Sequence, residues 1–281
     1  MKSSNPVLGR LMDRSAQHAS FNRAPAQQPY GAPGGYSTPD AYGQSPAMSS
    51  GYAPSTTDRM TIDDVVVRTI GLLVVVGIAG AAAWIALPRT GLSSMALFGA
   101  AGIGLILGLI ISFRGITNPV PIVAYAAIQG VLVGLISRIY EDVYSGIVLQ
   151  AVTATFGVFF GMAVLYKFRV IRATPTFTKW VIGALFGVVA LMLVNFLLAV
   201  FNVNDGTGLG LRSGGPLAIG FSLLCIGIAA LTFILDFKAI EDGVNAGVER
   251  RFAWYASFGI LVGLIWLYLE ILRLIGFLRS D

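Results

Sequence analysis

Seven long runs of apolar residues account for most of this 281-residue chain and restrict the folds that it can adopt. Each run is close to the ~20 residues that an α-helix needs to cross the ~30 Å hydrocarbon core of a bilayer. The runs are continuous rather than alternating, so they exclude a transmembrane β-barrel. The sequence therefore predicts an all-α membrane protein with a bundle of seven transmembrane helices in a lipid bilayer. The runs lie at about 68–87, 92–112, 120–139, 146–166, 180–201, 216–236 and 253–276.

The first 60 residues have a different composition from the rest. They contain the stretch APAQQPYGAPGGYSTPDAYGQSPAMSSGYAPSTT, which is rich in Pro, Gly, Ser, Gln and Tyr. Such a stretch cannot bury enough apolar surface to offset the entropy lost on ordering. We therefore predict two parts, a disordered N-terminal tail over 1–60 and a membrane domain over 61–281. Thr61, followed three residues later by Asp64, is typical of a helix start.

Short polar segments separate the apolar runs, and their residues favour turns. Four of these segments carry proline, which favours a break between helices. A further break is expected at Asp242-Gly243, just after the sixth run. The breaks contain Pro88, Asn118-Pro119, Thr174-Pro175, Asp205-Gly206, Gly214-Gly215-Pro216 and Asp242-Gly243.

The distribution of positive charge predicts the orientation of the chain. The net charge is +5, but the first 67 residues hold equal numbers of basic and acidic side chains, so the excess lies in the membrane domain. The second, fourth and sixth loops carry eight Lys and Arg residues, and the first, third and fifth carry three. By the positive-inside rule the N-terminus is cytoplasmic. Loop charge of this kind orients helices, so it does not predict nucleic-acid binding.

Pairs of glycines spaced four apart occur in five of the runs. One turn apart on one helix face, such glycines allow two backbones to approach closely, so we expect them to pack helices together rather than to bind a ligand. The pairs comprise Gly104, Gly108, Gly130, Gly134, Gly157, Gly161, Gly183, Gly187, Gly259 and Gly263.

The residue types found in the runs argue against catalysis. The chain has one histidine, His18 in the tail, and one cysteine, Cys225 in an apolar run. These counts predict no haem, no zinc and no thiol or histidine catalysis in the membrane domain. We therefore expect neither an enzyme nor a bound cofactor, and no tightly held metal ion.

Two acids lie in or at the end of apolar runs, and they are the candidate functional residues. A charge inside a span costs at least ~2.5 kcal/mol on insertion scales, so it needs a partner, a water path or a proton. Asp236 ends the sixth run, and we interpret it either as an interfacial acid or as a buried ion or proton site. Glu270 lies about 25 Å into the last run by helical rise. Arg273, three residues on, is its candidate salt-bridge partner, and a gate or proton site is the alternative.

These features resemble the Bax inhibitor-1 family, also called the transmembrane Bax inhibitor motif family. The resemblance rests on the seven runs, on LDFKAIEDG after the sixth and on LYLEILRLIGF in the last. It covers about residues 60–281. A bacterial branch of actinobacterial type is suggested by SSNPVL and by IVLQAVTATFGVFFGMAVLYKFRVIRATPTFTKWVIGALFG. The resemblance implies a bundle with the last helix central, in the plasma membrane of a bacterium.

The resemblance also implies a pH-sensitive calcium leak set by two aspartates on the last two helices. Asp236 matches the first of them. Gly263 stands where the family's leak-forming members carry the second, and Glu270 lies two turns further, ~10 Å along the helix. Two functions follow. The first is a calcium leak with Asp236 and Glu270 as proton-sensitive residues and calcium as the transported ion. The second is a non-conducting regulator that binds other membrane proteins, such as a quality-control protease.

Overall fold

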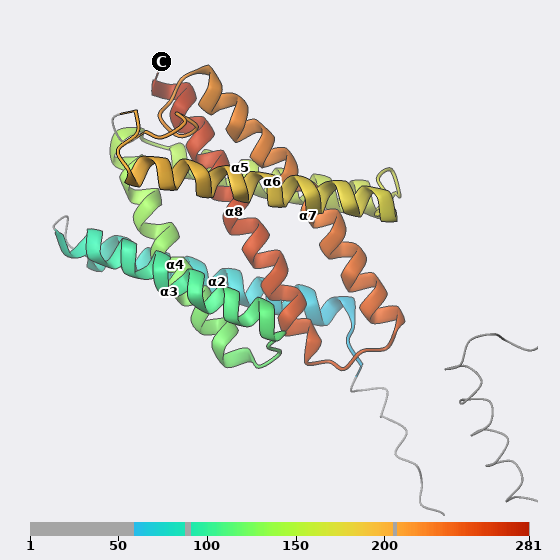
Figure 1. Cartoon of the computed structure of the whole chain (residues 1–281). Helices are drawn as coiled ribbons and strands as arrows, with labels where there is room; N and C mark the ends of the chain where they lie inside the picture. The colour runs from blue at the N-terminus through green and yellow to red at the C-terminus, as the bar shows by residue number, and fades with distance from the viewer. Residues whose placement is uncertain (1–58, 88–90, 205–206, 281) are drawn as a thin grey trace, which may run out of the picture. The chain divides into compact units, whose positions relative to one another are not determined.

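The computed structural model describes residues 59–87, 91–204 and 207–280, and these residues form seven helices. All seven are long and apolar enough to cross a membrane, which confirms the predicted all-α, multi-pass fold (Figure 1). The predicted disordered tail lies almost wholly outside the described residues. The helices are α2 (Ile62–Ala86), α3 (Gly91–Arg114), α4 (Pro119–Val143), α5 (Ile147–Lys167), α6 (Pro175–Val200), α7 (Pro216–Asn245) and α8 (Phe252–Ser280).

Local sequence sets where several helices begin. Thr61 and Asp64 form a capping box, in which each side chain binds the backbone N–H of the other. Such a cap satisfies N–H groups that have no partner in the first helical turn. Asn118 and Thr174 cap α4 and α6, each through a side-chain oxygen that accepts one backbone N–H, and each is followed by proline as the first helical residue. These starts agree with the turn residues seen in the sequence. The breaks expected at Pro88 and at Asp205-Gly206 lie outside the described residues.

α7 departs from the sequence prediction because it does not end at Asp236. It continues to Asn245, so the break expected at Asp242-Gly243 lies inside the helix. Gly243 lies inside the helix at a close contact, since an added Cβ would lie 2.9 Å from Cε of Met60. Met60 is buried, and its N–H donates to the Val248 carbonyl at 2.8 Å. Residues 59 and 60 therefore belong to the membrane domain and not to the tail.

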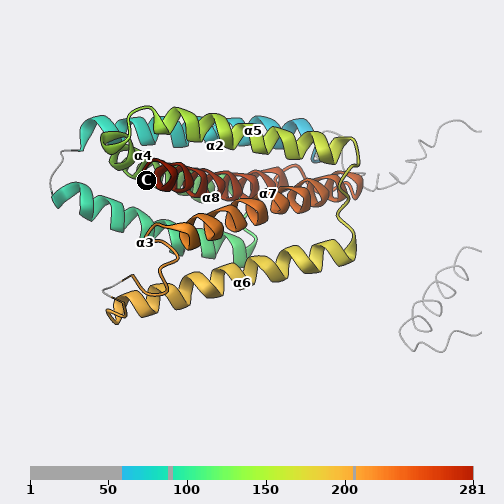
Figure 2. The same ribbon diagram turned by 90° about the horizontal axis from the view of Figure 1, so that it is seen from above.

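α8 occupies the centre of the bundle. It contacts α2, α4, α5 and α7, and it is the most buried of the seven spans. Figure 2 shows α7 and α8 between α2 and α5 on one side and α3 and α6 on the other. α3 packs mainly on α4, although the Tyr255 hydroxyl of α8 donates to its Ser112 carbonyl at 3.2 Å, and α6 packs mainly on α7. The central position implied for the last helix by the family resemblance is therefore confirmed.

The outer surface of the bundle is apolar, as a lipid bilayer requires. Large side chains such as Ile85, Phe113 and Trp180 are each at least three-quarters exposed. In water such a surface would drive aggregation, whereas in a bilayer it faces lipid tails. We call the end where α2 begins and α7 turns into α8 the N-terminal end of the bundle. The opposite end, where α8 finishes, is the C-terminal end.

Candidate functional site

Asp236 lies inside α7, nine residues before the helix ends, or roughly 13 Å along its axis. Its side chain is half-buried and faces α8, where an added Cβ on Gly259 would lie 3.8 Å from its Oδ1. Within the described residues it forms no hydrogen bond or ion pair. Asp236 is thus a carboxylate without a counter-charge at the contact between the two central helices.

Aromatic side chains surround this part of α7. Phe159 of α5 lies 5.1 Å from Phe233 and 5.7 Å from Phe237, measured between ring centroids. The two α7 rings lie on either side of Asp236 in the sequence. They offer no oxygen to a cation, so the polar environment of Asp236 has to come from its own carboxylate, from backbone or from water.

Gly263, the position to which the family resemblance assigns a second acid, faces α7 directly. A Cβ placed there would lie 2.9 Å from Cε1 of Phe233, a distance that real Cβ atoms essentially never show. The phenyl ring therefore occupies the space that a second aspartate would need. A carboxylate pair at this level is not built into the described part of the chain.

Glu270 has a different environment from Asp236. Its side chain is only 2% exposed, and both its oxygens accept from Nη1 of Arg273 at 2.8 Å. Nη2 of Arg212, in the turn between α6 and α7, lies 3.9 Å from Oε1 of the same carboxylate. Two guanidinium groups therefore surround one acid, and the cluster carries a net charge of +1.

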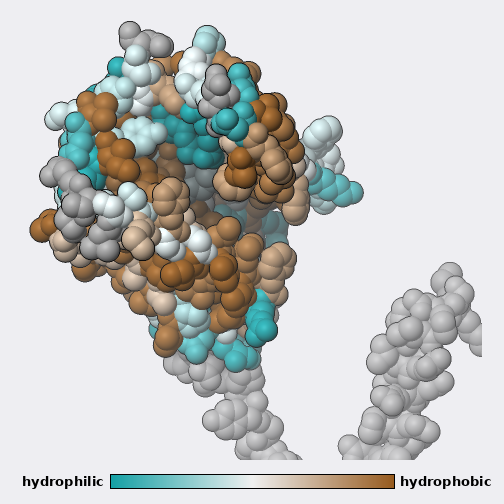
Figure 3. All heavy atoms as spheres, turned by 60° about the vertical axis from the view of Figure 1, so that its left-hand side comes forward, coloured by the Kyte–Doolittle hydropathy of each residue, from teal (hydrophilic) through white to brown (hydrophobic). Residues whose placement is uncertain are grey.

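Arg212 is the least enclosed member of this cluster, since its side chain is 44% exposed. Partial burial lowers the pKa of its guanidinium, and repulsion from Arg273 adds to the effect. Arginine nevertheless stays charged in proteins. Figure 3 turns the side where α8 ends toward the viewer and shows hydrophilic side chains in a hollow between hydrophobic walls. Arg212 and Asn195 line a cavity of about 610 Å³ at this end.

The two candidate acids do not meet. Asp236 lies beside Gly259, and Glu270 is eleven residues further along α8, which corresponds to about 16 Å by helical rise. Among the described residues, no group of three or more His, Cys, Asp or Glu side chains is placed to hold a metal ion. Calcium takes 6–8 oxygen ligands, so Asp236 and Glu270 do not supply a shared calcium site by themselves.

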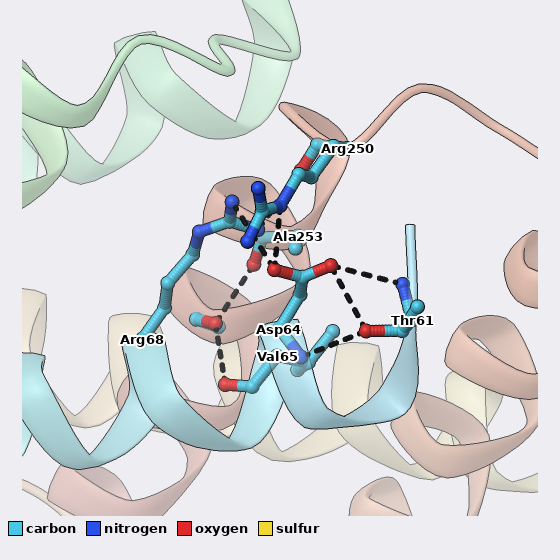
Figure 4. Close-up of polar contacts among 7 residues, drawn as sticks. Thr61, Asp64, Val65, Arg68, Arg250 and Ala253 are labelled. Carbon is cyan, nitrogen blue, oxygen red and sulfur yellow. Dashed lines mark hydrogen bonds and ion pairs between the residues drawn. The ribbon is translucent and has the colours of Figure 1, made fainter. Parts of the chain in front are cut away.

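The N-terminal end holds an ion-pair cluster that the sequence did not reveal (Figure 4). Nε of Arg250, just before α8, lies 2.7 Å from Oδ1 of Asp64, which also caps α2. Arg68 lies 3.7 Å from the same oxygen and donates to the Arg250 carbonyl at 2.9 Å. Ser257 of α8 donates to the Val65 carbonyl at 3.0 Å. We call these five residues the α2–α8 clasp.

The clasp joins residues almost two hundred positions apart in the chain. The capping pattern Thr61-x-x-Asp64 was visible in the sequence, but it gave no sign that Asp64 also binds Arg250. Asp63, its neighbour, carries the same side chain and is exposed. The roles of the two carboxylates differ only in the folded protein, where the Asp64 side chain points toward α8.

Six of the ten paired glycines lie against a neighbouring helix. An added Cβ on Gly130 or Gly134 would clash with the backbone of α2 around Val76 and Gly80. Gly104 and Gly108 face the side chains of Gln129 and Tyr125 on α4 at 3.0 Å. The remaining two, Gly259 and Gly263, face α7 as described above.

The other four paired glycines have open space around them. On α5 and α6, an added Cβ would meet no described atom within 4 Å. Their packing role stays a prediction, and only a lipid or another protein chain could provide the packing partner. These glycines are Gly157, Gly161, Gly183 and Gly187.

Comparison with known families and proteins gives one assignment. The family described as Bax inhibitor 1 like matches residues 5–280. The match starts well before residue 60, so it also extends over the segment that the sequence analysis left outside the resemblance. A comparison with curated protein sequences gave no significant match. With a family match over nearly its whole length and seven membrane-spanning helices, this chain belongs to the Bax inhibitor 1-like family.

Proposed function

We propose that this protein is a proton-sensitive cation leak of a bacterial plasma membrane, with its N-terminus in the cytoplasm and calcium as a transported ion. Asp236 is the control point. The observation that carries the proposal is that its carboxylate has no partner in the described residues, although it lies within a membrane span. A carboxylate in such a place is functional by default, because its charge is costly without a use.

In this proposal a proton and a cation compete for Asp236. Either one neutralises the carboxylate, and neither is held tightly, since few other oxygens surround it. Weak binding suits a transit site, because an ion that enters must also leave. The proposal gives Glu270 a structural part, since two arginines already neutralise its charge.

The test is calcium entry into liposomes that contain the purified protein, followed from pH 6 to 8. We expect a pH-dependent flux for the natural chain and little pH dependence for Asp236→Asn. The matched control is Asp242→Asn, on the same helix, where the acid is exposed and paired with Lys238. The control should behave as the natural chain does. Flux no higher than that of empty liposomes at every pH would refute the leak.

The second candidate function is a regulator that conducts no ion and binds other membrane proteins, such as a quality-control protease. The ring of Phe233 at Gly263 favours it, because it leaves no room for the second acid of the leak-forming members. The Asp236→Asn variant, which leaves the Glu270–Arg273 pair intact, separates the two functions. A leak should lose flux in this variant, whereas a regulator should keep its partners in a pull-down from membranes.

A further inference from the structure

A groove of about 970 Å³ runs between α2, α5 and α7 near the N-terminal end of the bundle. Its membrane-facing walls are apolar and include Ile70, Phe156 and Phe160. Cations line the same groove at the end of α5 and beyond it. Asp236 does not line the groove, so this feature is separate from the proposed leak. A groove that is apolar along its length and positively charged at one end is complementary to a lipid with an anionic headgroup.

Three of the cations have no use within the described bundle. Lys167, Arg169 and Arg172 are exposed, and none forms an ion pair or a side-chain hydrogen bond with another described residue. The acid that lines the groove, Glu241, already accepts a hydrogen bond from Tyr166. The positive charge at this end of the groove is therefore available to an anion.

Arg169 sits at a backbone position where glycine is the usual residue. It follows the last turn of α5 with φ of 57°, in the left-handed region. Its N–H donates to the Tyr166 carbonyl and that of Val170 to the Leu165 carbonyl, the two bonds of a Schellman motif. Glycine takes this conformation without steric cost, and a side chain does not. An arginine here gains nothing for the fold, which indicates that its charge serves another purpose.

A buried hydroxyl supplies a second polar feature. Thr69 lines the groove about 10 Å along α2, is 7% exposed, and its Oγ1 has no hydrogen-bond partner in the described residues. Thr153 and Thr155 on α5 instead donate to the carbonyl four residues before them. The corresponding carbonyl for Thr69, that of Val65, accepts from Ser257. Thr69 therefore retains a buried hydroxyl without a partner beside the groove.

We propose that this groove is a binding site for an anionic diacyl phospholipid. The acyl chains lie along the apolar walls between α2 and α5. The phosphate and headgroup meet Lys167, Arg169 and Arg172, and an ester carbonyl accepts from Thr69. The guanidinium groups give two-pronged contacts to phosphate oxygens. The site requires both the acyl chains and the anionic headgroup of the ligand, so neither a zwitterionic lipid nor a free phosphate ester satisfies it.

The test is native mass spectrometry of the delipidated full chain, titrated with phosphatidylglycerol and with phosphatidylcholine of the same acyl chains. We expect at least tenfold tighter binding of phosphatidylglycerol, equivalent to about 1.4 kcal/mol. The variant Arg169→Gly/Arg172→Gln should lose most of this preference, since each basic residue near an anionic surface contributes roughly a factor of five. Because Arg169→Gly relieves a strained backbone, the variant keeps its fold. The matched control, Arg114→Gln/Lys179→Gln, removes two cations at the same end but outside the groove, and should bind as the natural chain does.

Two further arms test the parts of the ligand. Glycerol 3-phosphate at millimolar concentration should not displace the lipid, and displacement would show a free phosphate site instead. Thr69→Val should weaken binding of the ester-linked lipid several-fold and leave an ether-linked analogue unaffected. Equal binding of the two headgroup classes, or equal losses in the groove variant and its control, would overturn the proposal.

Discussion

Replacing Glu270 by glutamine should destabilise the protein strongly, although it changes only one charge. The side chain is 2% exposed and shares both oxygens with Arg273, which is 17% exposed. Removing one partner of a buried ion pair costs about 3–5 kcal/mol, because the other charge is left without compensation. Solvent reaches part of Arg273 and much of Arg212, so the loss falls at the lower end, about 3 kcal/mol.

The free energy of unfolding can be measured by titration with sodium dodecyl sulfate in mixed micelles, followed by tryptophan fluorescence. The double variant Glu270→Gln/Arg273→Gln should recover much of the loss, because only the partly exposed Arg212 is then left without a counter-charge. Asp242→Asn is the matched control. Its partner Lys238 is on the same helix and both side chains are about half exposed, so the expected change is below ~1 kcal/mol.

The salt dependence gives the result that would refute this reasoning. The cost of Glu270→Gln should persist at 1 M salt, where the Debye length is only ~3 Å, because solvent ions do not reach the pair. A cost below about 1 kcal/mol, or a double variant as unstable as the sum of the two single ones, would mean that the two side chains are not coupled.

Three other substitutions test the packing and the clasp. Asp64→Ala should cost at least about 1 kcal/mol through loss of the cap and of the pair with Arg250, whereas Asp63→Ala, at an exposed neighbouring acid, should change unfolding little. Gly130→Ala should cost about 1–3 kcal/mol, because its Cβ would lie 2.6 Å from a carbonyl oxygen of α2, and Gly157→Ala, with open space, should be neutral or stabilising. Gly263→Asp should lower the thermal midpoint and add no pH dependence to calcium flux, because a phenyl ring fills that space. A steeper pH profile with unchanged stability would contradict this last prediction.

The sequence was sufficient for the parts of the fold that depend on local composition. Apolar run length predicted seven spans, and Thr61 marked a helix start because caps act within three residues. Asn118 and Thr174, which lie in predicted breaks, cap the helices that follow them. The end of α7 was missed because Gly243 normally signals a break. In the structure the helix runs through Gly243, and Met60, a residue far away in the chain, packs against it.

The contacts of the candidate site were likewise predictable only where they are local in the sequence. A salt bridge between Glu270 and Arg273 could be considered from their spacing of three residues. The approach of Arg212 from a different turn could not, and neither could the clasp between Asp64 and Arg250. Nothing local to Phe233 indicated that its ring would fill the space beside Gly263. Such contacts depend on which helices become neighbours, and a single sequence does not record that.

The pairing of Met60 with Val248 has a mechanical consequence. Residue 59 is where the N-terminal segment joins the bundle, and the adjoining residues are fastened both to the α7–α8 turn and, through Asp64, to Arg250. A pull on the N-terminal segment is therefore transmitted first to the turn between the two central helices. A partner that pulls the N-terminal segment away from the bundle therefore strains the α7–α8 pair, which carries Asp236. It does so without contacting the membrane-spanning part.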